Sequence, residues 1–239
     1  IFEGEYLNGL RNGKGKEYND NDKLIFEGEY INGIKNGNGK NYYENGKIQF
    51  EGEYLNGRRW NGKIYNNKSE EEFEIKNGNG QVKEYYDNGI LKFEGKYLNG
   101  ERNGKGKEYN KYDGIIKFEG EYLDGLKNGK GKVYNYFGEF LFEGEYLNGN
   151  KNGQGKEYNT DGKLKFEGEY LKGKRNGKGK EYYNNGILKF EGEYLNEKKW
   201  NGKGYNTEGK IDFEIKEGKG NGKEYDKDGI LRFEGEYLN

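Results

Sequence analysis

The side chains that could do chemistry in this chain are carboxylates, amines, guanidinium groups and phenols. Its 239 residues include 43 Asp and Glu, 42 Lys and Arg and 24 Tyr, with no His, Cys or Met. The missing His and Cys exclude Ser-His-Asp and Cys-His catalysis, disulfides, and metal sites built on those residues. General acid–base catalysis by paired carboxylates is the chemistry that remains.

The carboxylates are paired, but the same pattern supplies their counter-charges. Glu3 and Glu5 lie on one side of an extended segment, and Lys14 and Lys16 lie on one side of the next. Nothing in the sequence would bury these carboxylates and raise their pKa values. We therefore interpret the Glu and Lys residues as a solvated charge ladder, with no catalytic residues.

Three other local patterns have a chemical and a structural interpretation. Gly-x-Gly runs such as residues 13–15 resemble phosphate-binding loops but lack the helix and the Lys-Ser or Lys-Thr that follow in such loops. Residues 67–69 form a glycosylation sequon, which we interpret as accidental because no signal peptide is visible. The basic pairs at 58–59 and 198–199 are either solvated loop residues or contacts for an acidic or phosphorylated partner.

All these residues belong to a repeat of about 24 residues. The Phe that opens each Phe-Glu-Gly or Phe-Glu-Ile segment stands at 2, 26, 50, 73, 93, 118, 142, 166, 190, 213 and 233. A pair of irregular intervals, 23 and then 20, begins at Phe50 and again at Phe190, which indicates a duplication with an offset of 140 residues. We expect residues 1–239 to form one continuous array of these units.

Each unit predicts two β-strands. Phe, Gly and Tyr alternate with Glu in residues 2–6, residues 13–18 alternate in the same way, and Asn-Gly pairs separate such runs. The fold class is therefore all-β, a single-layer twisted antiparallel meander of about 21–22 strands in repeated hairpins. One face would carry Glu and Lys. The other would carry a Gly row flanked by Phe and Tyr, with each Tyr ring over a neighbouring Gly.

Matching the charges predicts the register. In the first hairpin, with its loop at residues 8–11, the pairs are Glu3 with Lys16, Gly4 with Gly15, Glu5 with Lys14, and Tyr6 with Gly13. In the next pairing they are Lys14 with Glu29, Gly15 with Gly28, and Lys16 with Glu27. Every Lys then lies between two Glu residues.

The irregular units carry the two Trp residues. Their spacing predicts that Trp60 lies on the aromatic face beside Tyr54, and that Trp200 lies there in the same way. Ile75 should face Val82 in place of the usual Gly pair. This bulk should either push the strands apart or fill a local pocket, so that the groove narrows or bends there. Core packing and a matched pair of docking points are both open interpretations.

The repeat resembles the MORN (membrane occupation and recognition nexus) family. The resemblance rests on aromatic-x-Gly-x-aromatic, x-x-Gly and Gly-x-Gly, as in residues 26–33 and 37–39, and it covers essentially the whole chain. The units at Phe73 and Phe213 depart from the pattern. The resemblance implies a twisted sheet of hairpins with an aromatic-lined groove. It also implies non-enzymatic scaffolding, dimerisation and partner binding, often at cytoskeletal or membrane-apposed structures.

We therefore expect a non-enzymatic scaffold that binds a protein partner in this groove, as an amphipathic helix or an extended segment, with no cofactor or metal. The candidate groove residues are the aromatic side chains Phe26, Tyr30, Phe50, Tyr54, Trp60, Phe93, Tyr97, Phe118, Tyr122, Phe142, Tyr146, Phe166, Tyr170, Phe190, Tyr194 and Trp200. Two alternatives stay open. One is a phospholipid-headgroup module, which would need a basic patch, and the other is a targeting module of an enzyme outside this sequence.

Charge and hydropathy limit partners and location. The net charge of −1 gives no overall basic field for nucleic acid or anionic lipid. No apolar run is long enough for a transmembrane helix or a signal peptide, so we expect a cytoplasmic protein. The resemblance to the MORN family implies cytoskeletal or membrane association. The sequence lacks capping units, so we expect an interior part of a longer protein. Open edges at residues 2–7 and 233–238 would then favour end-to-end or homodimeric contacts.

Overall fold

The computed structural model describes residues 1–226 and 230–238, which form strands joined by turns, with no helix among them. The chain is divided into two compact units, Ile1–Leu126 and Lys127–Asn239. The strands of the first unit are β1 (Phe2–Leu7), β2 (Leu10–Tyr18), β3 (Leu24–Ile31), β4 (Ile34–Tyr42), β5 (Ile48–Leu55), β6 (Arg58–Tyr65), β7 (Glu71–Ile75), β8 (Gly80–Tyr85), β9 (Leu91–Leu98), β10 (Glu101–Tyr109) and β11 (Ile116–Leu123).

The second unit continues the same alternation of strands and turns. Its strands are β12 (Leu126–Tyr134), which starts at the last residue of the first unit, β13 (Phe140–Leu147), β14 (Asn150–Tyr158), β15 (Leu164–Leu171), β16 (Lys174–Tyr182), β17 (Leu188–Leu195), β18 (Lys198–Tyr205), β19 (Ile211–Ile215), β20 (Lys219–Tyr225) and β21 (Leu231–Leu238). The predicted all-β hairpin meander is confirmed.

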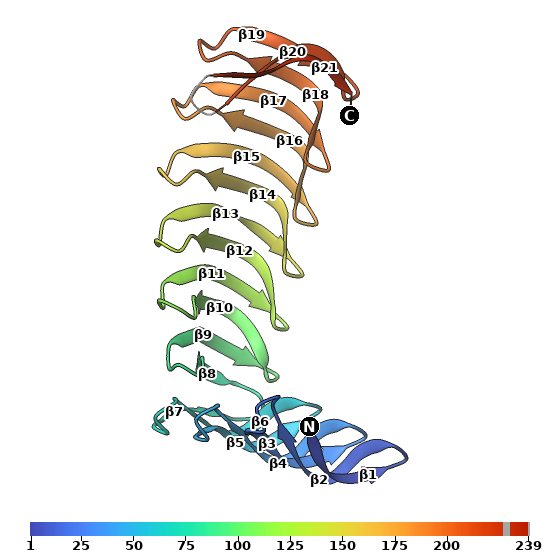
Figure 1. Ribbon diagram of the computed structural model, residues 1–239, viewed down its shortest axis with the longest axis vertical. Coiled ribbons are helices and arrows are strands. Elements are labelled where there is room, and N and C mark those ends of the chain that lie inside the picture. Colours follow the sequence, from blue (N-terminus) through green and yellow to red (C-terminus); the bar gives the residue numbers. More distant parts are fainter. Residues whose placement is uncertain (227–229, 239) are drawn as a thin grey trace. The chain divides into compact units, whose positions relative to one another are not determined.

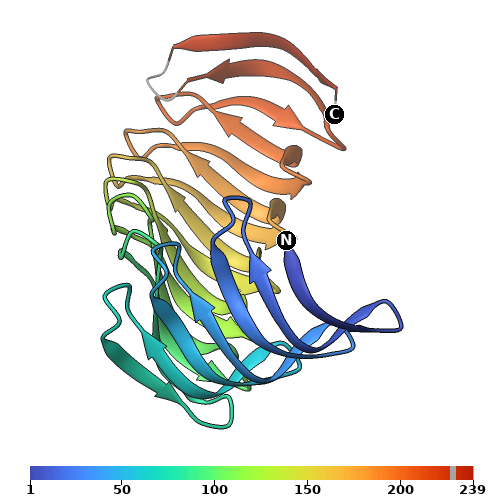
Figure 2. The same cartoon turned by 60° about the horizontal axis from the view of Figure 1, so that its bottom comes forward.

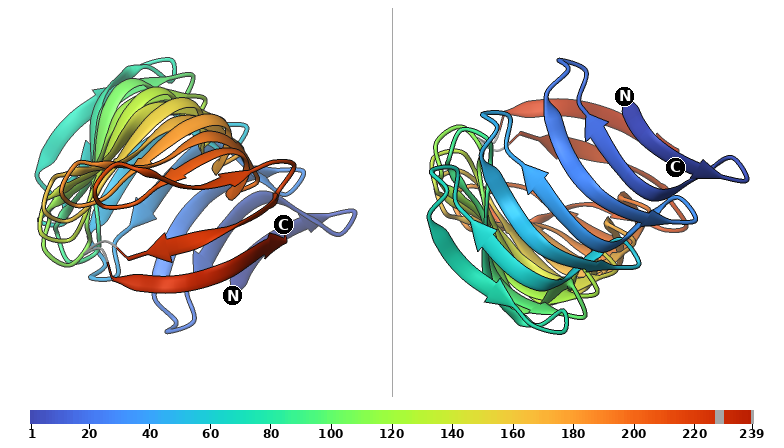
Figure 3. Two further views of the ribbon diagram at one scale, coloured as in Figure 1. Left: turned by 90° about the horizontal axis from the view of Figure 1, so that it is seen from above. Right: turned by 90° about the horizontal axis from the view of Figure 1, so that it is seen from below.

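Within each unit, consecutive strands pair antiparallel in chain order, with one interruption. In the first unit β1 to β7 form one sheet and β8 begins another (Figures 1 and 2). In the second unit β12 to β19 follow one another, and β20 and β21 form a separate pair; Figure 3 shows the curved strands from above and below. The meander is thus not one continuous sheet, which corrects the expectation of unbroken pairing.

The interruptions fall where the sequence pattern breaks. Only the isolated bridge Lys76↔Asn79 connects β7 to β8, and Lys216↔Lys219 connects β19 to β20. Ile75 pairs with Gly62 rather than facing Val82, whose partner is Gly95. The predicted Ile75–Val82 pair is wrong, because the shortened unit closes in a tight turn at once. β7 and β8 do belong to different sheets, and both apolar side chains are buried, but this separation does not come from an Ile75–Val82 pair.

The charge-based register is right in the middle of each strand. Glu3 pairs with Lys16 and Gly4 with Gly15, and Lys16 pairs in turn with Glu27 on the following strand. Near the hairpin turn the register differs, since Tyr6 pairs with Arg11 and not with Gly13. The Glu5–Lys14 pair is likewise absent from this ladder.

The difference comes from the Asn-Gly turn. Asn8 and Gly9 have φ values of 52° and 77°, the left-handed conformation of a two-residue type I′ turn, so the loop is shorter than the predicted residues 8–11. The extra residues of β2 form a bulge in which Gly13 has a φ of 81°. In the equivalent hairpin, Glu29 accepts a hydrogen bond from the bulge N–H of Asn38 at 3.1 Å. This second Glu thus supports the bulge within its own hairpin, while it still pairs with the preceding strand, as Glu29 does with Lys14.

Successive turns are also joined to one another along the sheet edge. The N–H of Gly33 donates to the carbonyl of Arg11 at 2.8 Å, and Gly57 donates to Lys35 in the same way. At the opposite edge the Oδ1 of Asn19 accepts from the N–H groups of Asn21 and Lys23, both at 3.0 Å. Each hairpin is therefore positioned by its predecessor and by its own turn side chain.

The core is a row of Phe rings lying on pairs of glycines. A Cβ on Gly28 or Gly39 would lie 2.7 Å from Cζ of Phe26, which is itself fully buried. Phe166 covers Gly168 and Gly179 in the second unit in the same manner. We predicted that Tyr would cover the glycines of the neighbouring strand. Tyr170 and Tyr194 do reach Gly155 and Gly179, but the Phe rings lie closer to the Gly pairs.

This arrangement predicts a large cost for adding one methyl group at the Gly row. In Gly168→Ala the new Cβ would lie 2.6 Å from two backbone atoms, Cα of Gly179 and O of Lys178, which cannot rotate away. We expect a loss of about 2–3 kcal/mol in the free energy of unfolding, measured by urea titration.

Gly162→Ala is the control. Its φ of 72° strains an alanine, but no atom lies within 4 Å, so we expect a loss of only about 1 kcal/mol. Equal losses in the two variants would contradict the packing explanation.

Candidate functional site

The Phe and Tyr residues among the candidate groove residues lie on one face of each sheet, which we call the aromatic face, and most are buried. Thirteen are at most 8% exposed: Phe26, Tyr30, Phe50, Tyr54, Phe93, Phe118, Tyr122, Phe142, Tyr146, Phe166, Tyr170, Phe190 and Tyr194. Tyr97, Trp60 and Trp200 are half-buried. Their role in binding stays a prediction, and a partner would first meet the groups that cover these rings.

The Tyr rings stand edge-on between Phe rings. Tyr30 contacts Phe2 and Phe26 with centroid distances of 5.3 and 5.5 Å and nearly perpendicular planes. The second unit repeats this arrangement for Tyr170, between Phe142 and Phe166. Edge-to-face contacts of this kind stabilise the fold in addition to the contribution from the apolar area that they bury. These ring contacts run from Phe2 to Phe50 and from Phe93 to Phe118 in the first unit, and from Phe142 to Phe190 in the second.

A row of cations covers the Phe rings, and the sequence analysis missed it. The Nζ of Lys35 lies 3.8 Å from the Phe26 centroid, and the guanidinium carbon of Arg102 lies 4.1 Å from that of Phe93. Arg175 covers Phe166 at 4.1 Å in the second unit. Each cation occupies the position opposite the Tyr of its hairpin, where we expected Gly. The bulge is what moves it there.

Carboxylates on the same face neutralise most of these cations. Glu17 lies opposite Phe26 and forms ion pairs with Arg11, at 2.5 Å, and Lys35, at 2.8 Å. Glu84 pairs with Arg102 at 2.9 Å. The strict alternation of residues 13–18 already placed position 17 on the aromatic face, so this acidic row could have been predicted.

Burial and charge act in opposite directions on these carboxylates. Burial alone would raise the pKa of Glu84, but its hydrogen bond and ion pair with Arg102 hold that pKa below the ordinary value. Burial also raises the pKa of Tyr146, to about 12. Groups held in one ionisation state near neutral pH present a constant charge to a ligand and are poorly suited to proton transfer.

Trp60 is the bulged residue of its hairpin. Tyr54 pairs with Arg59 and Glu53 with Asn61, so the predicted placement of Trp60 beside Tyr54 is wrong by one residue. The Trp60 carbonyl accepts from the N–H of Gly78 at 2.7 Å, and a Cβ on Gly78 would lie 2.8 Å from the indole. Trp60 thus packs against the next turn.

Trp200 repeats part of this arrangement in the second unit. Its carbonyl accepts a hydrogen bond from the N–H of Gly218 at 2.7 Å, and Tyr194 pairs with Lys199. The predicted neighbour of Tyr194 is therefore corrected by one residue here too. A docking role for either Trp stays a prediction.

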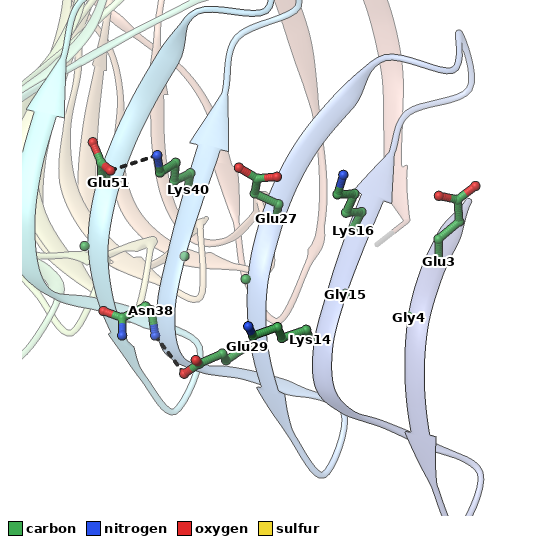
Figure 4. Close-up of a pocket in the computed structure, with 13 residues that line it drawn as sticks. Glu3, Gly4, Lys14, Gly15, Lys16, Glu27, Glu29, Asn38, Lys40 and Glu51 are labelled. Carbon is green, nitrogen blue, oxygen red and sulfur yellow. Dashed lines mark hydrogen bonds and ion pairs between the residues drawn. The ribbon is translucent and has the colours of Figure 1, made fainter.

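The opposite face carries the predicted ladder of Glu and Lys. In the first unit it forms an open trough whose floor is the backbone of the Gly row (Figure 4). One wall includes Lys40 and Glu51, paired at 2.9 Å, and the other includes Glu29 and Asn38. Because such pairs are exposed and mutually neutralised, each contributes at most about 1 kcal/mol. This face offers a partner little apolar anchorage.

The described residues show neither a membrane-spanning helix nor a metal cluster. Over 1–226 and 230–238, no helix has the length and apolar character needed to cross a bilayer. In the same part of the chain, no three acidic, His or Cys side chains gather as metal ligands would.

Comparison with known families identifies the repeat. Residues 2–23, 93–113, 118–134, 142–163 and 166–187 match the MORN repeat, and residues 35–56, 78–99 and 219–239 match a MORN repeat variant. A search of curated proteins finds no match.

The paired carboxylates of the aromatic face predict a stability change in acid. Burial would raise the pKa of Glu157, but Arg175 and Lys151 lower it from 4.5 to about 2. The ionised form therefore stabilises the fold fully above pH 4.5, and this contribution is lost as the pH falls towards 2. We expect Glu157→Gln to cost on the order of 2 kcal/mol at pH 7 and much less at pH 2.5, measured by urea unfolding.

Glu208→Gln is the control for this prediction. The Glu208 side chain is 69% exposed and pairs with the similarly exposed Lys210, so its substitution should change stability little at either pH. A cost for Glu157→Gln that does not depend on pH would show that the ion pairs contribute nothing.

Proposed function

Because the chain belongs to the MORN repeat family, whose members are binding modules, we propose that it is a non-enzymatic scaffold that binds a segment of another protein along the aromatic face. We place this activity in the cytoplasm, at cytoskeletal or membrane-apposed structures. The observation that carries the proposal is the row of half-buried cations and carboxylates above the buried rings. It recurs in unit after unit and combines apolar stems with fixed charges.

The spacing of this row fits both forms of partner considered from the sequence. One unit advances two strands, roughly 9.6 Å along the sheet. An extended segment rises about 3.3 Å per residue, so that every third residue would meet a new unit. A helix rises about 1.5 Å per residue, so that successive units would meet residues six or seven apart, on one helical face.

A phospholipid-headgroup site is less well supported. The cations of the aromatic face are mostly held by carboxylates of the same face, such as Glu17 and Glu84, and are not free to attract anionic lipid. The opposite face is neutralised in the same way by its ladder. The aromatic face suits a partner that supplies both apolar and charged groups.

The test compares equal charge changes on the two faces. Partners are captured with the tagged chain, identified by mass spectrometry and mapped by cross-linking. Affinities are then measured for Lys151→Gln, on the aromatic face, and for Lys156→Gln, on the opposite face. We expect Lys151→Gln to weaken binding about ten-fold and Lys156→Gln to weaken it less than two-fold.

A second pair addresses the rings themselves. Tyr122 and Tyr146 replaced by Ala should weaken binding more than Glu121 and Glu145 replaced by Ala, with unfolding measured in parallel because both Tyr side chains are buried. A partner whose cross-links fall on the Glu and Lys ladder, or whose affinity depends on Lys156 and not on Lys151, would overturn the assignment of the face.

A further inference from the structure

One position in the first unit breaks the acidic row of the aromatic face. Phe50 lies opposite Asn41 on one neighbouring strand and opposite Ile64 on the other. Phe26, Phe93 and other members of the row have Glu in at least one of these positions. No carboxylate is therefore available to the cation that covers Phe50.

That cation is Arg59. Its guanidinium carbon lies 5.0 Å from the Phe50 centroid, and Nη2 donates to Oε1 of Gln49 at 2.6 Å. In the part of the chain that the structure describes, no carboxylate lies within 4.0 Å of it. Arg11 and Lys35 stand in the same row and share the single carboxylate of Glu17. Three cations thus face one acid.

The duplicated half shows what normally fills this place. At an offset of 140 residues, Asn41 corresponds to Glu181, Gln49 to Lys189 and Arg59 to Lys199. The Glu181 carboxylate forms ion pairs with both cations, at 3.5 Å from Nζ of Lys199 and 3.7 Å from Nζ of Lys189. The aromatic frame is the same in the two copies, since Phe190 and Tyr194 replace Phe50 and Tyr54 without change of residue type. The carboxylate that pairs with these cations in the second copy is absent from the first.

We propose that Arg59, with Gln49 beside it, is a subsite that binds the side-chain carboxylate of an acidic partner segment. The partner's carboxylate would take the place that the Glu181 carboxylate has in the second copy. The partner would thus supply the negative charge that the first copy lacks, because Asn41 is uncharged. This inference rests on the proposed function and names one specificity element within it. With donors engaged by Gln49 and by the Tyr54 hydroxyl, the guanidinium still keeps N–H donors for a bidentate contact with a carboxylate. A half-buried cation without a counter-charge also gains more from such a contact than an exposed one.

The experiment uses the whole chain and a defined probe. The probe is a fluorescein-labelled dodecapeptide of alternating Glu and Ser, compared with its Gln-Ser counterpart by fluorescence anisotropy. Asn41→Glu introduces the acid of the second copy, and Asn41→Gln is its uncharged control of equal size. We expect Asn41→Glu and Arg59→Gln to lower the affinity for the acidic peptide about ten-fold. Asn41→Gln should change this affinity little, and Arg59→Lys should have an intermediate effect.

The second copy gives a gain-of-function arm. Glu181→Asn should create a matching site and raise the stoichiometry from one acidic peptide to two. Equal affinity of the native chain and Asn41→Glu for the acidic peptide would overturn the proposal. A second result would also overturn it. If the native chain and Asn41→Glu differed in binding to vesicles of phosphatidylcholine with phosphatidylserine, but not in binding to the peptide, Arg59 would be assigned to a lipid headgroup.

The two proposals fail separately. A protein partner that cross-links to the aromatic face but binds Asn41→Glu as well as the native chain leaves the scaffold function standing and removes the subsite. Selective loss of the acidic peptide without any protein partner on this face retains the subsite and removes the scaffold function. Thermal unfolding of each variant separates both results from a loss of fold.

Discussion

The contact between a Phe ring and a pair of glycines is the interaction on which the rest of this protein depends. A one-layer sheet has no second layer to cover its apolar side, so the cover must come from its own side chains. Gly28 and Gly39 leave the space that the Phe26 ring fills, and Tyr30 then closes the gap to the previous ring. Each unit is completed only by its neighbours, so stability is a sum of nearest-neighbour terms.

This constraint explains why the sequence predicts the middle of each strand so well and its ends less well. Gly must face Gly for the ring to fit, and Glu must then face Lys. The Gly4–Gly15 and Glu3–Lys16 pairs therefore follow from the alternation of residues along each strand. The Asn-Gly turn obeys a different rule. Its left-handed residues fix a two-residue loop, and the bulge that absorbs the remainder shifts Tyr6 onto Arg11. Two local preferences compete there, and alternation cannot decide between them.

The surface row of the aromatic face was harder to predict for the same reason. Glu17 could be placed by alternation, but Arg11, Lys35 and Arg59 reach the rings only because of the bulge. Sequence reasoning therefore found the buried rings, which hold the sheet together, and missed the charges that cover them. The Trp60 error has the same origin, since a one-residue bulge replaces the longer one of the regular hairpins.

The internal duplication allows the buried rings and the charges that cover them to be compared between two copies. Between the halves, Phe50, Gly52 and Gly62 correspond to Phe190, Gly192 and Gly202, because a larger residue at either glycine would meet the facing strand. The covering charges are not constrained in this way. Glu181 and its counterpart Asn41 differ in charge, while the Phe–Tyr contact beside them is nearly the same in the two halves, at 5.4 and 5.2 Å. Recognition can therefore vary from unit to unit on a frame that remains the same, which is what a repeat scaffold with several distinct contacts along its length requires.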